Sequence, residues 1–161
     1  MKTISRTLAS GSLASLLSVL VMTRRGRVDS HSALAPLNAP SHWLHGDKAL
    51  AQDGPSWRYT GTGTLIHHAS AMMWGVLYDR LLSRSTRLNG SAGGVVAGAA
   101  ALTAVAALVD FKLVPSRLTP GFEHRLSRQS LLGVYAAFAA GLALGGLLIR
   151  QRKDAPTESS K

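Results

Sequence analysis

The sequence predicts an all-α integral membrane protein: a bundle of four transmembrane helices with a short interfacial helix in the first long loop. Two observations carry this prediction. Apolar residues gather in blocks of roughly the 18–20 residues that a helix needs to cross the hydrocarbon core, and arginine-rich connections separate these blocks. The predicted spans are 4–22, 63–82, 92–109 and 129–149. At 161 residues the chain fits one domain, 1–153, followed by a polar tail, 154–161, that we expect to be disordered.

A membrane protein with basic residues at its helix ends would account for the net charge of +10. Basic residues such as Arg24, Arg84 and Arg128 flank the apolar blocks, where they hold helix ends at phospholipid head groups. No RNA- or DNA-binding motif accompanies them, so we do not expect nucleic-acid binding. Cysteine is absent from the sequence. Disulfides, thiolate metal sites and cysteine nucleophiles are therefore excluded.

The first block is expected to remain as a helix rather than to be cleaved as a signal peptide. Thr23–Arg27 follow it directly, without the small-x-small pattern of a cleavage site. With four spans both termini lie on one side of the membrane, and each side carries nine of the eighteen Lys and Arg residues. The positive-inside rule therefore does not decide the orientation. We expect cytoplasmic termini, because the polar tail costs less when it is not translocated.

A long connection separates the first two spans and contains local helix signals. Ala35–Pro40 should be extended or turned, because each proline disfavours helix in the residue before it. Ser41 can cap a short helix from His42 to about Gln52, which Gly54-Pro55 ends. Trp43 on the apolar side of that helix places it at the membrane interface. Between the third and fourth spans, Thr119-Pro120 has the pattern of a helix start and predicts a fourth helix that begins near Pro120.

Rows of small residues mark the helix faces expected to pack. Small rows let backbones approach closely, which drives helix association where lipid offers no hydrophobic contrast. The rows predict that the third and fourth spans are neighbours. They leave open whether the rows serve packing within one bundle, homodimerisation or a larger membrane-protein partner. The residues expected at these contacts are Gly94, Gly98, Gly133, Ala137, Gly141 and Gly145.

Histidines supply the candidate site. His67 and His68 lie inside the second span, where an ionisable side chain is costly and therefore suggests function. His42 and His45 are three residues apart and share a helix face. The four residues are candidate metal ligands if the loop folds over the start of the second span, although no fixed-spacing zinc motif is present. Adjacent histidines point about 100° apart on a helix, so the pair cannot serve one site equally.

Other chemistry has no motif in the sequence. A nucleophile elbow, a P-loop and a dinucleotide fingerprint are all missing, and we expect no catalytic residues and no cofactor. The other three spans lack charged residues in their interiors, which argues against transport by a monomer.

Three stretches carry a family resemblance: 38–47 (NAPSHWLHGD), 65–78 (LIHHASAMMWGVLY) and 113–124 (LVPSRLTPGFEH). They resemble small bacterial four-helix inner-membrane proteins of unknown function. The resemblance implies a multi-pass protein of the bacterial inner membrane and supplies no site residues.

The expected role is non-enzymatic. We expect a scaffold or accessory subunit that lies in the lipid bilayer and packs through its Gly/Ala helix faces against a second copy or a larger membrane protein. The alternative is a histidine-based metal, haem or proton-relay site at the membrane interface, built from His42, His45, His67 and His68. A small channel or transporter is a third possibility.

Overall fold

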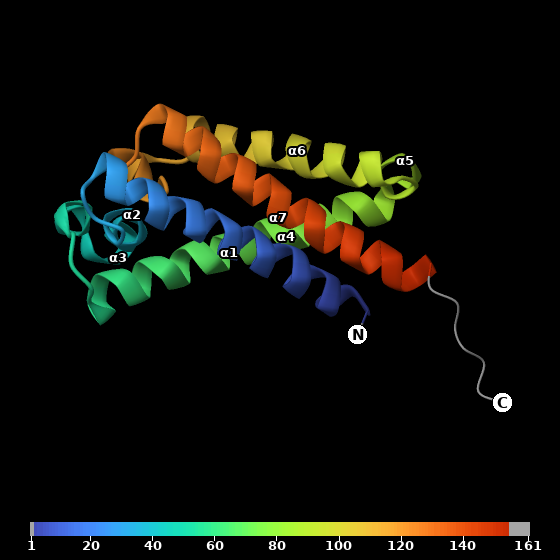
Figure 1. The fold of residues 1–161 in the computed structure, drawn as a ribbon, viewed down its shortest axis with the longest axis horizontal. Coiled ribbons are helices and arrows are strands. Elements are labelled where there is room, and N and C mark those ends of the chain that lie inside the picture. Colours follow the sequence, from blue (N-terminus) through green and yellow to red (C-terminus); the bar gives the residue numbers. More distant parts are fainter. Residues whose placement is uncertain (1, 155–161) are drawn as a thin grey trace.

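The computed structural model describes residues 2–154, with side chains from 8 to 150, and all its elements are helical (Figure 1). The all-α prediction is confirmed for this range. Four long helices form the bundle: α1 (Lys2–Asp29), α4 (Thr62–Arg84), α6 (Ala92–Leu108) and α7 (Arg128–Asp154). The predicted tail lies outside the described residues from 155 onward.

Short helical elements connect the long helices and gather at the two ends of the bundle. Figure 1 shows α2, α3 and the connection before α7 at one end, and α5 at the other. In chain order these elements are α2 (Ala35–Asn38), η1 (Ala39–Ser41), α3 (His42–His45), η2 (Asp47–Ala51), η3 (Trp57–Gly61), α5 (Thr86–Asn89), η4 (Val109–Leu113), η5 (Ser116–Leu118) and η6 (Phe122–His124). Of these, η3 and η4 are π-helical turns.

The most extensive helix contact joins α1 to α7. A Cβ on Gly141 would collide with the backbone of Ala14, and a Cβ on Gly145 would collide with the backbone of Ser10. Only glycine lets the two backbones come this near. The predicted contact between the third and fourth spans is also present, since α6 packs on α7. The glycine row of α7, however, packs against α1 and not against α6.

The other predicted packing residues have looser surroundings. A Cβ on Gly98 would meet side chains of α4 at ordinary contact distance, and one on Gly133 would lie 3.6 Å from Val21. Gly94 faces the backbone of Leu88 in α5, so it serves the turn between α5 and α6 rather than a contact between two long helices. Ala137 is half-buried.

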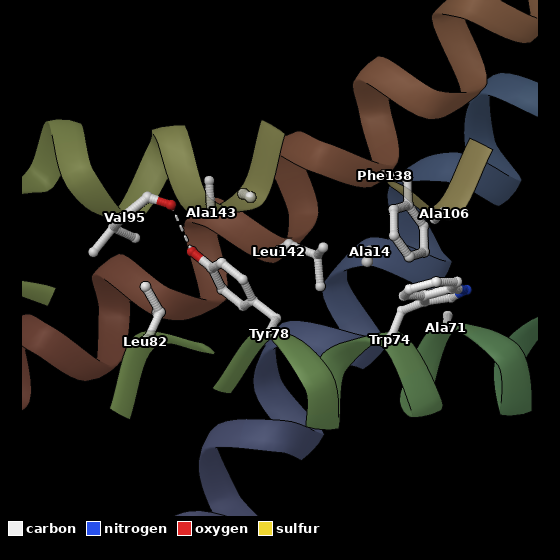
Figure 2. Close-up of a cluster of buried hydrophobic side chains, with 11 residues drawn as sticks. Ala14, Ala71, Trp74, Tyr78, Leu82, Val95, Ala106, Phe138, Leu142 and Ala143 are labelled. Atoms are coloured by element: carbon white, nitrogen blue, oxygen red, sulfur yellow. Dashed lines mark hydrogen bonds between the residues drawn. The ribbon is translucent and has the colours of Figure 1, made fainter. Parts of the chain in front are cut away.

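The main core lies between α4, α6 and α7 and is drawn in Figure 2. Tyr78 is fully buried, and its hydroxyl donates to the carbonyl oxygen of Val95 at 2.8 Å, which ties α4 to α6. Trp74 and Phe138 lie together at the other end of this cluster (Figure 2). A second cluster lies beneath the loops; its buried members are Met22, Leu37, Ala39, Phe122, Leu126 and Val134.

Polar contacts tie the end of α1 to the start of α7. The Asp29 carboxylate accepts from the backbone N–H of Ser127 at 2.9 Å and pairs with Arg25 at 3.6 Å. Arg25 also donates to the Ser130 hydroxyl at 2.7 Å. The Ser130 hydroxyl and the Ser127 N–H stabilise the charged carboxylate and hold the pKa of Asp29 below its ordinary value.

Two of the described helical segments are long and apolar enough to cross a membrane: Ala92–Leu113 and Arg128–Arg150. They correspond to the third and fourth predicted spans. α1 has 28 residues and α4 has 23, so both are long enough, but both are more polar. The serines of α1 and the histidines of α4 account for part of that polarity.

Three local predictions were wrong. Ala35–Pro40 is helical, because Pro36 and Pro40 occupy first-turn positions where proline is tolerated. The helix predicted from His42 to Gln52 breaks at Gly46, whose φ is +67°. The fourth long helix begins at Arg128 and not near Pro120, because Gly121 turns the chain with a φ of +82°.

Candidate functional site: a cavity between α4, α6 and α7

A cavity of about 200 Å³ lies where α4 and α6 separate. Figure 1 shows these two helices meeting at α5 and diverging toward the end that carries α2 and α3. The cavity is larger than an engineered apolar cavity of about 150 Å³ that binds benzene. It can therefore hold a molecule with one six-membered ring, and it is too small to enclose a haem.

The cavity walls are mainly apolar and unusually aromatic. Five aromatic side chains contribute to the lining: Trp43, Trp74, Phe122, Tyr135 and Phe138. The ring centroid of Phe122 lies 6.3 Å from His67 and 6.4 Å from Tyr135, so it bridges two sides of the space. Walls of this kind suit an apolar ring, with the few polar groups left to fix its orientation.

His67 supplies the polar group on the α4 side. Its Nε2 lies 2.9 Å from the hydroxyl oxygen of Ser18 on α1. That hydroxyl also lies 2.7 Å from the carbonyl oxygen of Ala14, which can only accept. The Ser18 hydroxyl therefore donates its single hydrogen to the Ala14 carbonyl oxygen, and the Nε2–H of His67 donates to the Ser18 hydroxyl oxygen. In the neutral ring this leaves Nδ1 as a hydrogen-bond acceptor.

Asp110 and Tyr135 supply the polar groups on the opposite side. The π-helical turn η4 continues α6, which keeps Asp110 on the helix instead of in the following loop. The Tyr135 hydroxyl donates to a carboxylate oxygen of Asp110 at 2.6 Å. Glu123 is near enough for its charge to act on both groups. One Glu123 oxygen is buried and has no hydrogen-bond partner among the described residues.

The loop segments close one end of the cavity and are fixed to each other. His42 Nε2 and Trp43 Nε1 both donate to the carbonyl oxygen of Thr119, at 2.9 and 2.8 Å. Gly121 follows in a left-handed conformation, and a Cβ there would lie 2.8 Å from the carbonyl oxygen of Ala39. Glycine is therefore required for the two loops to meet.

The four histidines proposed as metal ligands have separate surroundings. His42 is bound to Thr119, and His45 packs edge-on against Tyr59 with centroids 5.7 Å apart. His67 lines the cavity, whereas His68 lines an open surface groove beside Trp57. Over residues 2–154, no three His, Asp or Glu side chains are close enough together to hold a metal ion. His67 and His68, which were predicted not to serve one site equally, therefore line two different hollows.

Sequence reasoning missed Asp110, Tyr135 and Glu123. The third predicted span ended at residue 109, one position before Asp110. Tyr135 was counted within an apolar block, although a tyrosine hydroxyl inside a span needs a partner. The signal that could have identified Asp110 is its position directly after an apolar run. A π-helical turn extends the helix there by a few residues and includes Asp110 in it.

Comparison with family models, curated proteins and solved structures finds no match to this chain.

Proposed function

We propose that this chain is an integral membrane protein in which α1, α4, α6 and α7 all cross the bilayer, and that it binds a small, mainly apolar molecule in the cavity. The cavity is the observation that carries the binding proposal: it joins aromatic walls to polar groups on two opposing sides. Few convergent polar groups in an apolar pocket are typical of small-molecule sites.

The outer surfaces of the helices support four spans. Each long helix exposes large apolar side chains, and α1 and α4 do so although their composition is more polar: Leu16 is 55% exposed and Leu65 is 68% exposed. The polarity of α1 lies partly inside, where Ser10 and Ser18 are buried. A bundle with apolar residues outside and small polar residues inside suits a lipid environment. Each long helix has a large apolar side chain exposed on its outer face: Leu16 on α1, Leu65 on α4, Val105 on α6 and Leu132 on α7.

The cavity reaches the apolar outer surface. Met73 on α4 and Leu118 on η5 both line it, and they are 52% and 44% exposed. A ligand can therefore enter from the hydrocarbon region and leave an apolar tail there. We also propose that the protein lies in the bacterial inner membrane, as the family resemblance implies, and that both termini are on the cytoplasmic side.

The scaffold role predicted from the glycine rows has less support. Gly141 and Gly145 are already covered by α1 of the same chain. A second copy or a larger partner would have to use other surfaces. The histidine site is supported in a changed form, with His67 as a hydrogen-bonding group of the cavity and not as a metal ligand.

Ligand binding can be tested with a variant that fills the cavity. Ser70 lines the cavity on α4, and the neighbouring Ala69 faces outward. Purified Ser70→Phe should lose the stabilisation that small aromatic compounds give to the wild-type protein in a thermal-shift assay, and Ala69→Phe should keep it. Extraction of the membranes with alkaline carbonate should leave the protein in the pellet. Release of the protein by carbonate, or equal stabilisation of both variants, would contradict the proposal.

A further inference from the structure

The cavity has an acidic side that no ion pair among the described side chains neutralises. Asp110 lines the cavity, and the hydrogen-bond donor that the described residues offer it is the uncharged hydroxyl of Tyr135. The ion pairs found in the described part of the chain do not include Asp110. Lys112 lies two positions away but does not line the cavity. A carboxylate in apolar surroundings is costly unless an opposite charge approaches it.

Glu123 adds to this negative potential. Its charge acts on Asp110 and Tyr135, and its side chain is 18% exposed. One of its oxygens pairs weakly with His124 at 3.8 Å, and the other is buried without a hydrogen bond in the described structure. Asp110 therefore lines the cavity, and Glu123, which does not line it, lies near enough for its charge to act on Asp110. Their common requirement is a positive charge or a strong hydrogen-bond donor.

The aromatic walls favour the same partner. Phe122 and Tyr135 lie together beside Asp110, with Phe111 5.6 Å from Tyr135 on its other side. The faces of aromatic rings attract an ammonium group, most strongly where water is excluded. A metal ion does not fit, because the described residues offer no set of three ligands. The size of the cavity limits the part enclosed to about one ring.

From this charge and shape we infer that the cavity binds a hydrophobic organic amine, with its ammonium group on Asp110 and its ring between Trp74, Phe122 and Phe138. The inference rests on the proposed function and specifies its ligand class. His67 lies across the cavity and, as an acceptor, can take a hydrogen bond from a second donor on the ring. The apolar tail leaves between Met73 and Leu118.

The test compares two compounds that differ only in their head group, one a charged ammonium and the other an uncharged hydroxyl. The probes are para-butylbenzylamine, which is charged at neutral pH, and para-butylbenzyl alcohol, which is an uncharged donor. Binding is measured by isothermal titration calorimetry on the full chain in an uncharged detergent. The amine should bind at least about tenfold more tightly than the alcohol, as expected for a charge-assisted hydrogen bond. Asp110→Asn should remove this preference, and Asp47→Asn, at an exposed acid, should retain it.

A second variant keeps the inference testable if Asp110→Asn does not fold. Glu123→Gln should weaken the amine about threefold and leave the alcohol unchanged, because it removes a charge that the ammonium group feels at a distance. Equal affinities of the two compounds, with both lost in Ser70→Phe, would overturn the amine inference and leave the proposed function intact. Failure of both compounds to bind the wild-type protein would contradict the proposed function itself.

Discussion

The hydroxyl of Tyr135 on α7 and the carboxylate of Asp110 on η4 are joined by a hydrogen bond of 2.6 Å at the wall of the cavity. This bond connects η4, which continues α6, to α7. It also sets the geometry of the acidic side of the site, because it fixes one oxygen of Asp110.

Tyr135→Phe should destabilise the fold, because it leaves a carboxylate oxygen without its donor. The expected loss in the free energy of unfolding is about 1–3 kcal/mol. Denaturation in detergent, followed by circular dichroism, measures this loss. Tyr59→Phe is the control, since the Tyr59 hydroxyl is not among the hydrogen bonds of the described structure and a phenylalanine ring keeps the contacts with His45 and Arg58. Equal stability of Tyr135→Phe and the wild type would contradict the importance of this bond.

Gly141→Ala and Gly133→Ala form a matched pair on α7. A methyl group on Gly141 would collide with the backbone of Ala14, which cannot move without shifting α1. A methyl group on Gly133 would make an ordinary contact, 3.6 Å from Val21. We expect Gly141→Ala to cost about 1–3 kcal/mol through overpacking and Gly133→Ala to be neutral or slightly stabilising. Thermal unfolding in detergent compares the two, and similar midpoints would contradict the close α1–α7 contact.

Asp29 should make the stability depend on pH in the acidic range. Its pKa is lower in the folded state than the ordinary value of 3.8, so the charged carboxylate favours folding. This contribution is fully present above the ordinary value and is lost as the pH falls through the lowered folded-state pKa. Asp29→Asn should therefore be less stable than the wild type near neutral pH, and the difference should shrink at strongly acidic pH. A difference that grows on acidification would contradict the assignment.

The four-span topology can be tested by cysteine labelling, because the sequence has no cysteine of its own. Thr86 in α5 and Asp47, two residues after α3, are exposed, and Figure 1 shows α5 and α3 at opposite ends of the bundle. With cytoplasmic termini, Asp47→Cys should react with a membrane-impermeant maleimide in intact cells, and Thr86→Cys should react only after lysis. The reverse pattern would invert the orientation. Reaction of both positions in intact cells would contradict four spans.

The sequence allowed the long helices and several contacts to be predicted, because apolar blocks and small rows act locally. The third predicted span began at residue 92, and α6 begins at Ala92. The glycine row of α7 was predicted, but its partner on α1, which includes Ser10 and Ala14, lies more than a hundred residues away in the sequence. No local pattern states which of several small rows will face it.

The site was predicted less well, for a physical reason. Histidines stand out in an apolar span, whereas Asp110 lies at the boundary where a span and a loop cannot be distinguished by hydropathy. A π-helical turn decided that boundary, and such turns depend on tertiary packing. The loop stretches 38–47 and 113–124 stand out in the sequence, but nothing in the sequence shows that they meet. In the structure His42 and Trp43 join them by donating to the carbonyl oxygen of Thr119.

The contact between α1 and α7 also affects the order in which the protein can be assembled during synthesis. α1 is synthesised first, and Ser10 and Ser18 stay exposed until the helices that bury them have been synthesised. α4 can cover part of this surface early, but the backbone of Ala14 is sealed only when Gly141 emerges near the end of the chain. The cavity likewise gains its last wall with α7. A nascent chain stalled before the final helix should therefore have neither a closed bundle nor a binding site, and its unsatisfied α1 face would be open to quality-control factors of the membrane.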